Sequence, residues 1–174
     1  MSRAAVDDLM QGFRFHVVAQ TAGGENPLEY ARQGEYQGGG QAGFTSATLP
    51  ELSVEVAEYR EGTFQWTQKY AGVPTVSDVS LMRGVAKQDT AFLDWVRASV
   101  DGEEYRCDVT IYHYQRTEMG QASQSEVGDD IRRVECKNCV PIRGKAAGDF
   151  DSTSSEVSVS EVDFALESFE IKTS

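Results

Sequence analysis

Hydrophobic and polar residues alternate with a period of two along most of the chain, a pattern typical of half-buried β-strands. Alternation predicts strands over residues 13–20, 52–59, 76–83, 104–116, 131–142 and 154–171. In the last segment the apolar phase changes from Val157 and Val159 to Val162, Phe164 and Leu166. A change of phase needs one extra residue, so we expect a β-bulge near Ser160–Glu161.

One segment has a helical period instead. Phe92, Trp95 and Val96 recur at helical spacing within residues 89–100, and Asp89 is a suitable N-cap. The pattern as a whole predicts about seven strands, with one short helix after the third or fourth. Because strands and helices do not alternate, we expect antiparallel pairing. The predicted fold class is mainly β, an antiparallel β-sandwich or small barrel with one short flanking helix.

A length of 174 residues suits one domain, so residues 1–174 are interpreted as a single domain with two loop excursions. Residues 21–43 hold seven of the 16 glycines, which makes this stretch too long and glycine-rich for a simple turn. The second loop, residues 117–130, is polar and acidic.

The net charge of the chain limits the classes of partner that it could bind. The chain has 16 Lys and Arg against 28 Asp and Glu, a formal net charge of −12. Such a balance argues against a surface that grips nucleic-acid phosphates and against attraction to an anionic membrane. Neither a membrane-spanning apolar run nor a signal peptide is visible, so we expect synthesis and folding in a cytoplasm.

Gly38, Gly40 and Gly43 form a G-x-G-x-x-G run. A dinucleotide site needs this run to open a helix, whereas here Pro50 follows and the helical period is missing. His16 and His113 lie in predicted strands, away from any nucleophile motif. We therefore expect no cofactor and no catalytic site, and the residues indicate a binding or assembly module rather than an enzyme.

Cys136 and Cys139 form a C-x-x-C pair, and Cys107 is the third cysteine. The pair lies in a strand-like run, so neither a zinc site nor a thioredoxin-like motif is favoured. If the strand is regular, the odd spacing directs Cys136 and Cys139 to opposite faces. Two interpretations stay open for Cys107, Cys136 and Cys139, namely disulfide bonds between subunits and buried, reduced thiols.

Read in order, three segments resemble a known family, the tail tube proteins of contractile phage tails. Residues 7–18 resemble the family's acidic lead, Gly-aromatic pair and first strand. Residues 54–96 resemble its E-Y-R-E-G turn, its K-x-x-G element (Lys69 and Gly72), its L-x-R-G strand end and its Trp-bearing helix. Residues 134–171 resemble its N-x-x-P corner and closing strand.

The resemblance implies a β-sandwich or small barrel that assembles into hexameric rings, which stack into a hollow tube inside a sheath. Its implied partners are further copies of the chain and the tail sheath, baseplate, tape-measure and tail terminator proteins. DNA would pass through the lumen without specific binding, and a lumen rich in Asp and Glu would repel its phosphates. The implied location is the virion tail, after synthesis in the host bacterial cytoplasm, and disulfides between subunits would form once the virion leaves that cytoplasm.

Two alternatives accompany this interpretation. The same fold also forms the inner tube of phage-tail-like bacteriocins and extracellular contractile injection systems. From another class, the chain could be a soluble β-sandwich binding module or a zinc-stabilised module.

Overall fold

The computed structural model describes residues 15–28, 44–85, 89–114, 131–148, 153 and 155–173. This part of the chain holds nine strands and one helix, which confirms a mainly β fold with antiparallel pairing and one helix. The elements are β1 (Phe15–Thr21), β2 (Phe44–Ala47), β3 (Leu52–Tyr59), β4 (Gln68–Val76), β5 (Val79–Gly84), α1 (Ala91–Asp101), β6 (Cys107–Tyr114), β7 (Ile131–Lys145), β8 (Val159–Ala165) and β9 (Ser168–Thr173). The G-x-G-x-x-G glycines, the loop 117–130 and residues 7–14 lie outside the described residues.

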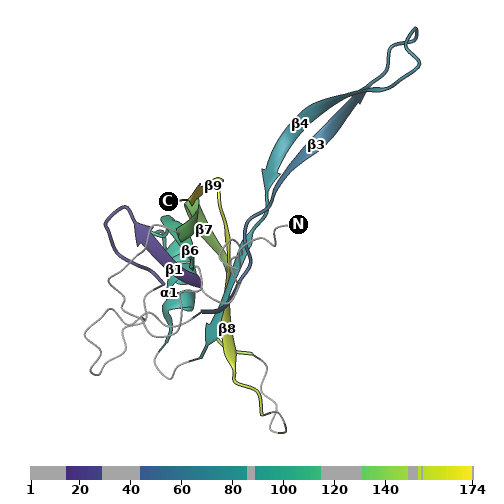
Figure 1. Ribbon diagram of the computed structural model, residues 1–174. Coiled ribbons are helices and arrows are strands. Elements are labelled where there is room, and N and C mark those ends of the chain that lie inside the picture. The colour runs from purple at the N-terminus through teal and green to yellow at the C-terminus, as the bar shows by residue number, and fades with distance from the viewer. Residues whose placement is uncertain are drawn as a thin grey trace, which may run out of the picture.

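Seven strands form one antiparallel sheet in two parts that share β7 (Figure 1). In the first part, which we call sheet A, the order is β1-β6-β7-β9. In the second, sheet B, the later residues of β7 pair with β8, and the order continues through β5 to β2. The path has two free ends, so the described strands do not close into a barrel.

A β-bulge interrupts β7 next to β6. Cys107 and Val109, two residues apart on β6, pair with Cys139 and Cys136, three residues apart on β7. Asn138 takes the left-handed conformation there, with φ 51°, which Asn tolerates better than most residues. The strand is therefore not regular, and the expectation of opposite faces does not hold, because both Cys136 and Cys139 are fully buried.

The core lies where sheets A and B face α1, which packs on β7 and β8. It is formed by fifteen buried apolar residues, namely Val17, Ala19, Leu28, Val79, Leu81, Phe92, Trp95, Cys107, Val109, Ile111, Val134, Cys136, Cys139, Val162 and Phe164. Trp95 anchors the helix, because its ring packs 5.7 Å from that of Phe164 and its indole N–H donates to the Tyr105 carbonyl at 2.7 Å. The buried phases of β1, β5 and β6 match the predicted alternation.

The start of the helix differs from the prediction. The N-cap residue is Thr90 rather than Asp89. The Asp89 carboxylate instead accepts a hydrogen bond from the Ala91 N–H at 3.3 Å and pairs with Arg83, a partner that local helix patterns do not reveal. The helix follows the fifth described strand, whereas the sequence predicted it after the third or fourth. The difference arises because the prediction lacked β2 and β4.

The predicted bulge near Ser160–Glu161 is wrong. The β8 register with β5 runs without a shift from Val159 to Phe164. Ser160 occupies an inward position of β8, where its hydroxyl donates to the Arg83 carbonyl at 3.3 Å. A serine at a buried position therefore makes the apolar pattern look as if it changed phase, although the strand is regular. The predicted strand 154–171 is in fact two strands, β8 and β9, which pair with different halves of β7.

Candidate assembly surfaces

Strands β3 and β4 form a long hairpin that projects away from the rest of the molecule (Figure 1). The predicted alternation of β3 is present, but neither face of the strand is covered. On the apolar face, Leu52, Val54 and Val56 are 58%, 48% and 61% exposed, and they pair across the hairpin with Val76, Pro74 and Ala71. A patterned apolar face that the described chain leaves uncovered is typical of a protein–protein contact.

The hairpin also carries aromatic residues near its tip. Tyr59, Phe64 and Trp66 are all exposed, Trp66 to 77%. A bulge in β4 opposite Glu55 lies nearer the base, and Gly72 fits there because a Cβ atom would come within 2.9 Å of the Glu55 carbonyl oxygen. Gly72 and Lys69, both quoted for the family resemblance, thus belong to this projecting arm, where Lys69 forms an exposed ion pair with Glu58 at 3.6 Å.

Sheet A has a free edge on each side. Among the described residues, β1 pairs only with β6, and β9 pairs only with β7. Strand directions alternate across β1-β6-β7-β9, so the two edge strands run in opposite directions. An open edge presents unpaired backbone donors and acceptors, to which a strand of another chain can be added.

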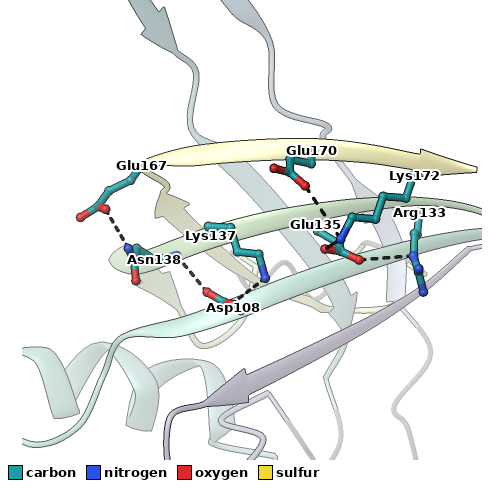
Figure 2. Close-up of polar contacts among 8 residues, drawn as sticks. All are labelled: Asp108, Arg133, Glu135, Lys137, Asn138, Glu167, Glu170 and Lys172. Carbon is teal, nitrogen blue, oxygen red and sulfur yellow. Dashed lines mark hydrogen bonds and ion pairs between the residues drawn. The ribbon is translucent and has the colours of Figure 1, made fainter.

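The face of sheet A that points away from the core is polar and holds its charges in ion pairs (Figure 2). At one end, Asp108 on β6 accepts hydrogen bonds from the Lys137 ammonium at 2.9 Å and from the Asn138 N–H at 3.0 Å. Burial favours a higher pKa for Asp108, but these hydrogen bonds outweigh it and lower the pKa. The Asn138 side chain in turn donates to Glu167 at 2.8 Å, which ties the bulge to the start of β9.

Glu135 is the centre of the second group on this face. Its carboxylate lies 2.6 Å from the Lys172 ammonium on β9 and 3.3 Å from Arg133 on its own strand. The hydrogen bond from Lys172 is the main reason that the pKa of Glu135 is lowered. Glu170 faces Glu135 directly in the register, and Lys172 lies 3.8 Å from it as well. This lysine thus offsets the repulsion between two opposed carboxylates.

A buried ion pair links the end of β5 to the residue before the N-cap of α1. The Arg83 guanidinium binds the Asp89 carboxylate, donates to the Leu28 carbonyl at 2.7 Å and lies 4.1 Å from the centre of the Phe92 ring. Sequence reasoning missed this pair, although a signal was present. Arg83 shares the apolar phase of Val79 and Leu81, and a charged residue in such a phase points to a buried partner.

The structure brings the three predicted cysteines together. Cys107, Cys136 and Cys139 are free thiols buried in one subunit around the bulge of β7. An inter-subunit disulfide remains a prediction, and it would require this part of the core to open. His16 stacks on Tyr112 on the polar face of sheet A, with the two ring centroids 5.9 Å apart. His113 lies on β6, two residues after Ile111.

The described residues contain neither a cluster of metal ligands nor a membrane-spanning helix. In that part of the chain, His, Cys, Asp and Glu residues do not gather into a group of three or more that could hold a metal ion. Within the same residues, helices long and apolar enough to cross a membrane are absent.

Comparison with known proteins gives a family match. The family model of the T4-like virus tail tube protein gp19 matches residues 11–170. A search of curated proteins found no match.

Similar folds occur among solved structures. One is the sheath-tube complex of an extracellular contractile injection system in its extended state, with a TM-score of 0.71 at 18% identity over 97% of this chain and 95% of that one. Another is the tube-terminating cap of the anti-feeding prophage, with a TM-score of 0.70 at 20% identity over 99% and 97% of the two chains. A crystal structure of an Hcp protein has a TM-score of 0.55 at 8% identity and covers 92% of this chain and 99% of that one.

Proposed function

We propose, from the premise that the chain belongs to the T4-like virus tail tube protein family, that it forms hexameric rings that stack into the hollow inner tube of a contractile tail. Residues 1–174 would act as one tail-tube domain. The observation that carries the proposal is the uncovered apolar face of the β3–β4 hairpin. The alternation of apolar and polar residues in β3 is typical of a strand with one buried face. Further copies of the chain would bury this face in the assembly.

The edges of sheet A suggest how one ring closes. If β9 of one subunit lies beside β1 of the next, the two strands are antiparallel, like every other pair in the sheet. This contact joins different surfaces of two identical subunits, so repetition with the right rotation closes a ring without any free edge. The hairpin contributes a separate contact, through which rings would stack on one another.

Geometry also suggests which face of sheet A would line the lumen. The core, α1 and sheet B lie on one face, whereas the described part of the chain leaves the polar face uncovered. In a closed ring the bulkier layer fits on the outside, where the circumference is larger. On the strands of sheet A, the described charges that would face inward are then three acids (Asp108, Glu135, Glu170) and three bases (Arg133, Lys137, Lys172). Next to Asn138, Glu167 adds a fourth acid and its ion-pair partner Arg106 a fourth base.

Such a lining would be balanced rather than acidic, which modifies the prediction of a lumen rich in Asp and Glu. The amino groups that could hold phosphates are already engaged with carboxylates, Lys137 with Asp108 and Lys172 with Glu135. The pKa of Lys137 is raised mainly by its hydrogen bond to Asp108, so the pair remains charged at neutral pH. DNA would pass such a surface without being gripped.

The biological setting follows from the tube. We propose that the chain is made in the cytoplasm of a host bacterium and becomes part of the tail of a phage virion, as the conduit for DNA ejection. Its partners would be the tail sheath, baseplate, tape-measure and tail terminator proteins. The similarity to the chain from a sheath-tube complex supports the sheath as a partner, since that chain has the same fold.

A second candidate keeps the tube and changes its cargo. The chain would form the inner tube of a bacteriocin or an extracellular contractile injection system. Its near-complete overlap with a chain from an extracellular contractile injection system favours this candidate. The genes next to the coding sequence separate the two candidates, because capsid and terminase genes belong to a phage alone.

Negative-stain microscopy of the purified protein tests the proposal. We expect rings or hollow tubes with six-fold end views from the wild type. Val56→Asp, on the apolar face of the hairpin, should abolish stacking because it places a carboxylate in a desolvated contact. Val100→Asp is the matched control, since Val100 is 80% exposed on α1. Wild-type protein that stays monomeric under all conditions, or equal assembly of both variants, contradicts the proposal.

A further inference from the structure

The three cysteine thiols of the chain meet in the core at the bulge of β7. Cys107 on β6 faces Cys139 in the register, and Val109 faces Cys136. All three side chains are buried, and Cys136 and Cys139 have no exposed surface. None of these thiols is needed by the proposed assembly surfaces, which lie on the hairpin, the sheet edges and the polar face.

The bulge shortens the distance between Cys136 and Cys139. In a regular strand, three steps separate Cα atoms by about 10 Å and place the side chains on opposite faces. Here the two residues pair with β6 positions only two steps apart, a span of about 6.8 Å. Because the bulge draws the Cα atoms of Cys136 and Cys139 toward that spacing, they approach the upper end of the Cα separations seen in disulfides, about 4.4–6.8 Å. Because both side chains also point inward, the geometry that the bulge creates suits a covalent bond.

The two thiols already interact. A hydrogen bond between them lowers the pKa of Cys136 and raises that of Cys139, so Cys136 is the better nucleophile of the pair. Burial, followed by the charge of Asp108, raises the pKa of Cys107 to about 12, so Cys107 is a poorer attacking thiol than Cys136. Cys136 is therefore the attacking thiol, and Cys139, with which it shares the hydrogen bond, is the resolving thiol.

We propose that Cys136 and Cys139 form a disulfide within one subunit, across the bulge at Asn138, when the protein meets a peroxide. The Cys136 thiolate takes an oxygen atom from hydrogen peroxide and becomes a sulfenic acid, while hydroxide leaves and takes up a proton to become water. The Cys139 sulfur then attacks the Cys136 sulfur and displaces a second water. The two thiols lose two electrons and two protons in total, and the peroxide is reduced to two waters.

The bond would form inside the subunit rather than between subunits. It would fix the bulge at which β7 passes from sheet A to sheet B, without changing the surface that neighbouring subunits contact. It also competes directly with inter-subunit disulfides, because both would use the same sulfur atoms. Since the thiols are buried, the reaction proceeds through local opening of the strand and is slow.

Trypsin reports the pairing directly, because it cleaves after Arg106, Arg116, Arg133, Lys137 and Arg143. The cysteines then lie on three different peptides, residues 107–116, 134–137 and 138–143. The folded protein is treated with hydrogen peroxide, denatured with iodoacetamide to block remaining thiols, and digested without reductant for mass spectrometry. We expect peptides 134–137 and 138–143 to remain linked and to separate on reduction, while peptide 107–116 carries the alkyl group.

Variants and a gel complete the test. Cys139→Ala should abolish the link, whereas Cys107→Ala should retain it, and the wild-type peptide map remains decisive if a variant fails to fold. Non-reducing electrophoresis should show the oxidised chain as a monomer. A link from peptide 107–116 to either of the others, a reductant-sensitive ladder of subunits, or complete alkylation of all three cysteines after prolonged oxidation overturns the proposal.

Discussion

The backbone N–H of Asn138 donates a hydrogen bond of 3.0 Å to the carboxylate of Asp108, and this contact joins the bulge of β7 to β6. The same carboxylate binds Lys137 at 2.9 Å, and the Asn138 side chain reaches Glu167 at 2.8 Å (Figure 2). A single irregular residue thus connects β6, β7 and β9. It also sets which cysteines point into the core.

Replacing Asn138 should be costly when the new residue is β-branched. Asn138 has φ 51°, a conformation that Gly adopts freely and Val adopts only with strain of about 1–3 kcal/mol. We expect Asn138→Val to lower the free energy of unfolding by about that amount. Asn138→Gly should lower it by less, through loss of the exposed contact with Glu167. Urea denaturation of both variants measures the difference, and equal losses would contradict a role for the backbone conformation.

Removing Asp89 should greatly lower the free energy of unfolding. The side chains of Asp89 and Arg83 are both buried, so Asp89→Ala leaves an uncompensated guanidinium in the core. We expect a loss of about 3–5 kcal/mol in the free energy of unfolding. The double variant Arg83→Met with Asp89→Ala should recover a large part of the loss, because it buries no charge. A double variant as unstable as Asp89→Ala would show that the cost comes from packing rather than from charge.

Acid should weaken the attachment of β9 through Glu135. The pKa of Glu135 is lowered in the folded state, chiefly by Lys172, so the unfolded state binds a proton more readily. The stabilisation is therefore present above the unfolded value of about 4.3 and is lost as pH falls through the lower folded value. We expect Glu135→Gln to cost about 0.5–1 kcal/mol at pH 7 and to reduce the loss of stability on acidification.

Lys172→Met provides the matched comparison for this pH effect, because it removes the same ion pair from the other side. Its stability should depend on pH as weakly as that of Glu135→Gln between pH 7 and pH 3. Denaturation curves across this range test the assignment, and a wild-type dependence in both variants would refute it.

Gly72 should matter for the hairpin and for assembly rather than for the core. A Cβ atom on Gly72 would lie 2.9 Å from the Glu55 carbonyl oxygen, so Gly72→Ala must distort the bulge of β4. A Cβ atom on Gly62, near the tip, would have no atom within 4 Å, which makes Gly62→Ala the control. We expect unchanged thermal unfolding of the body in both variants, and fewer tubes by electron microscopy for Gly72→Ala alone. Equal tube formation by the two variants would count against the hairpin contact.

Periodicity predicted much of the fold, because β1, β5 and β6 bury alternate side chains against one core. The strands that the sequence did not reveal lack this signal. β2 has only four residues, and β4 contains Gly72 and Pro74, which are uncommon inside strands. The alternation of β3 predicts a strand, which the structure confirms, but the same pattern arises whether the apolar face is covered by the same chain or by another.

The candidate site was harder to predict because it depends on register. The faces of Cys136 and Cys139 follow from the bulge, whose only local signal is Asn138, a residue that tolerates the left-handed conformation. The pairing of Glu135 with Lys172 joins positions 37 residues apart, and the pairing of Arg106 with Glu167 joins positions 61 apart. Contacts over such distances follow only once the strand order is known.

A cryo-EM reconstruction of assembled tubes, at a resolution that traces the strands, tests the central claim most directly. The account predicts hexameric rings in which β9 of each subunit lies antiparallel to β1 of the next, with Glu135 and Lys172 facing the lumen and the β3–β4 hairpin contacting another subunit. Rings joined through other edges, or a lumen lined by the opposite side of sheet A, would contradict it.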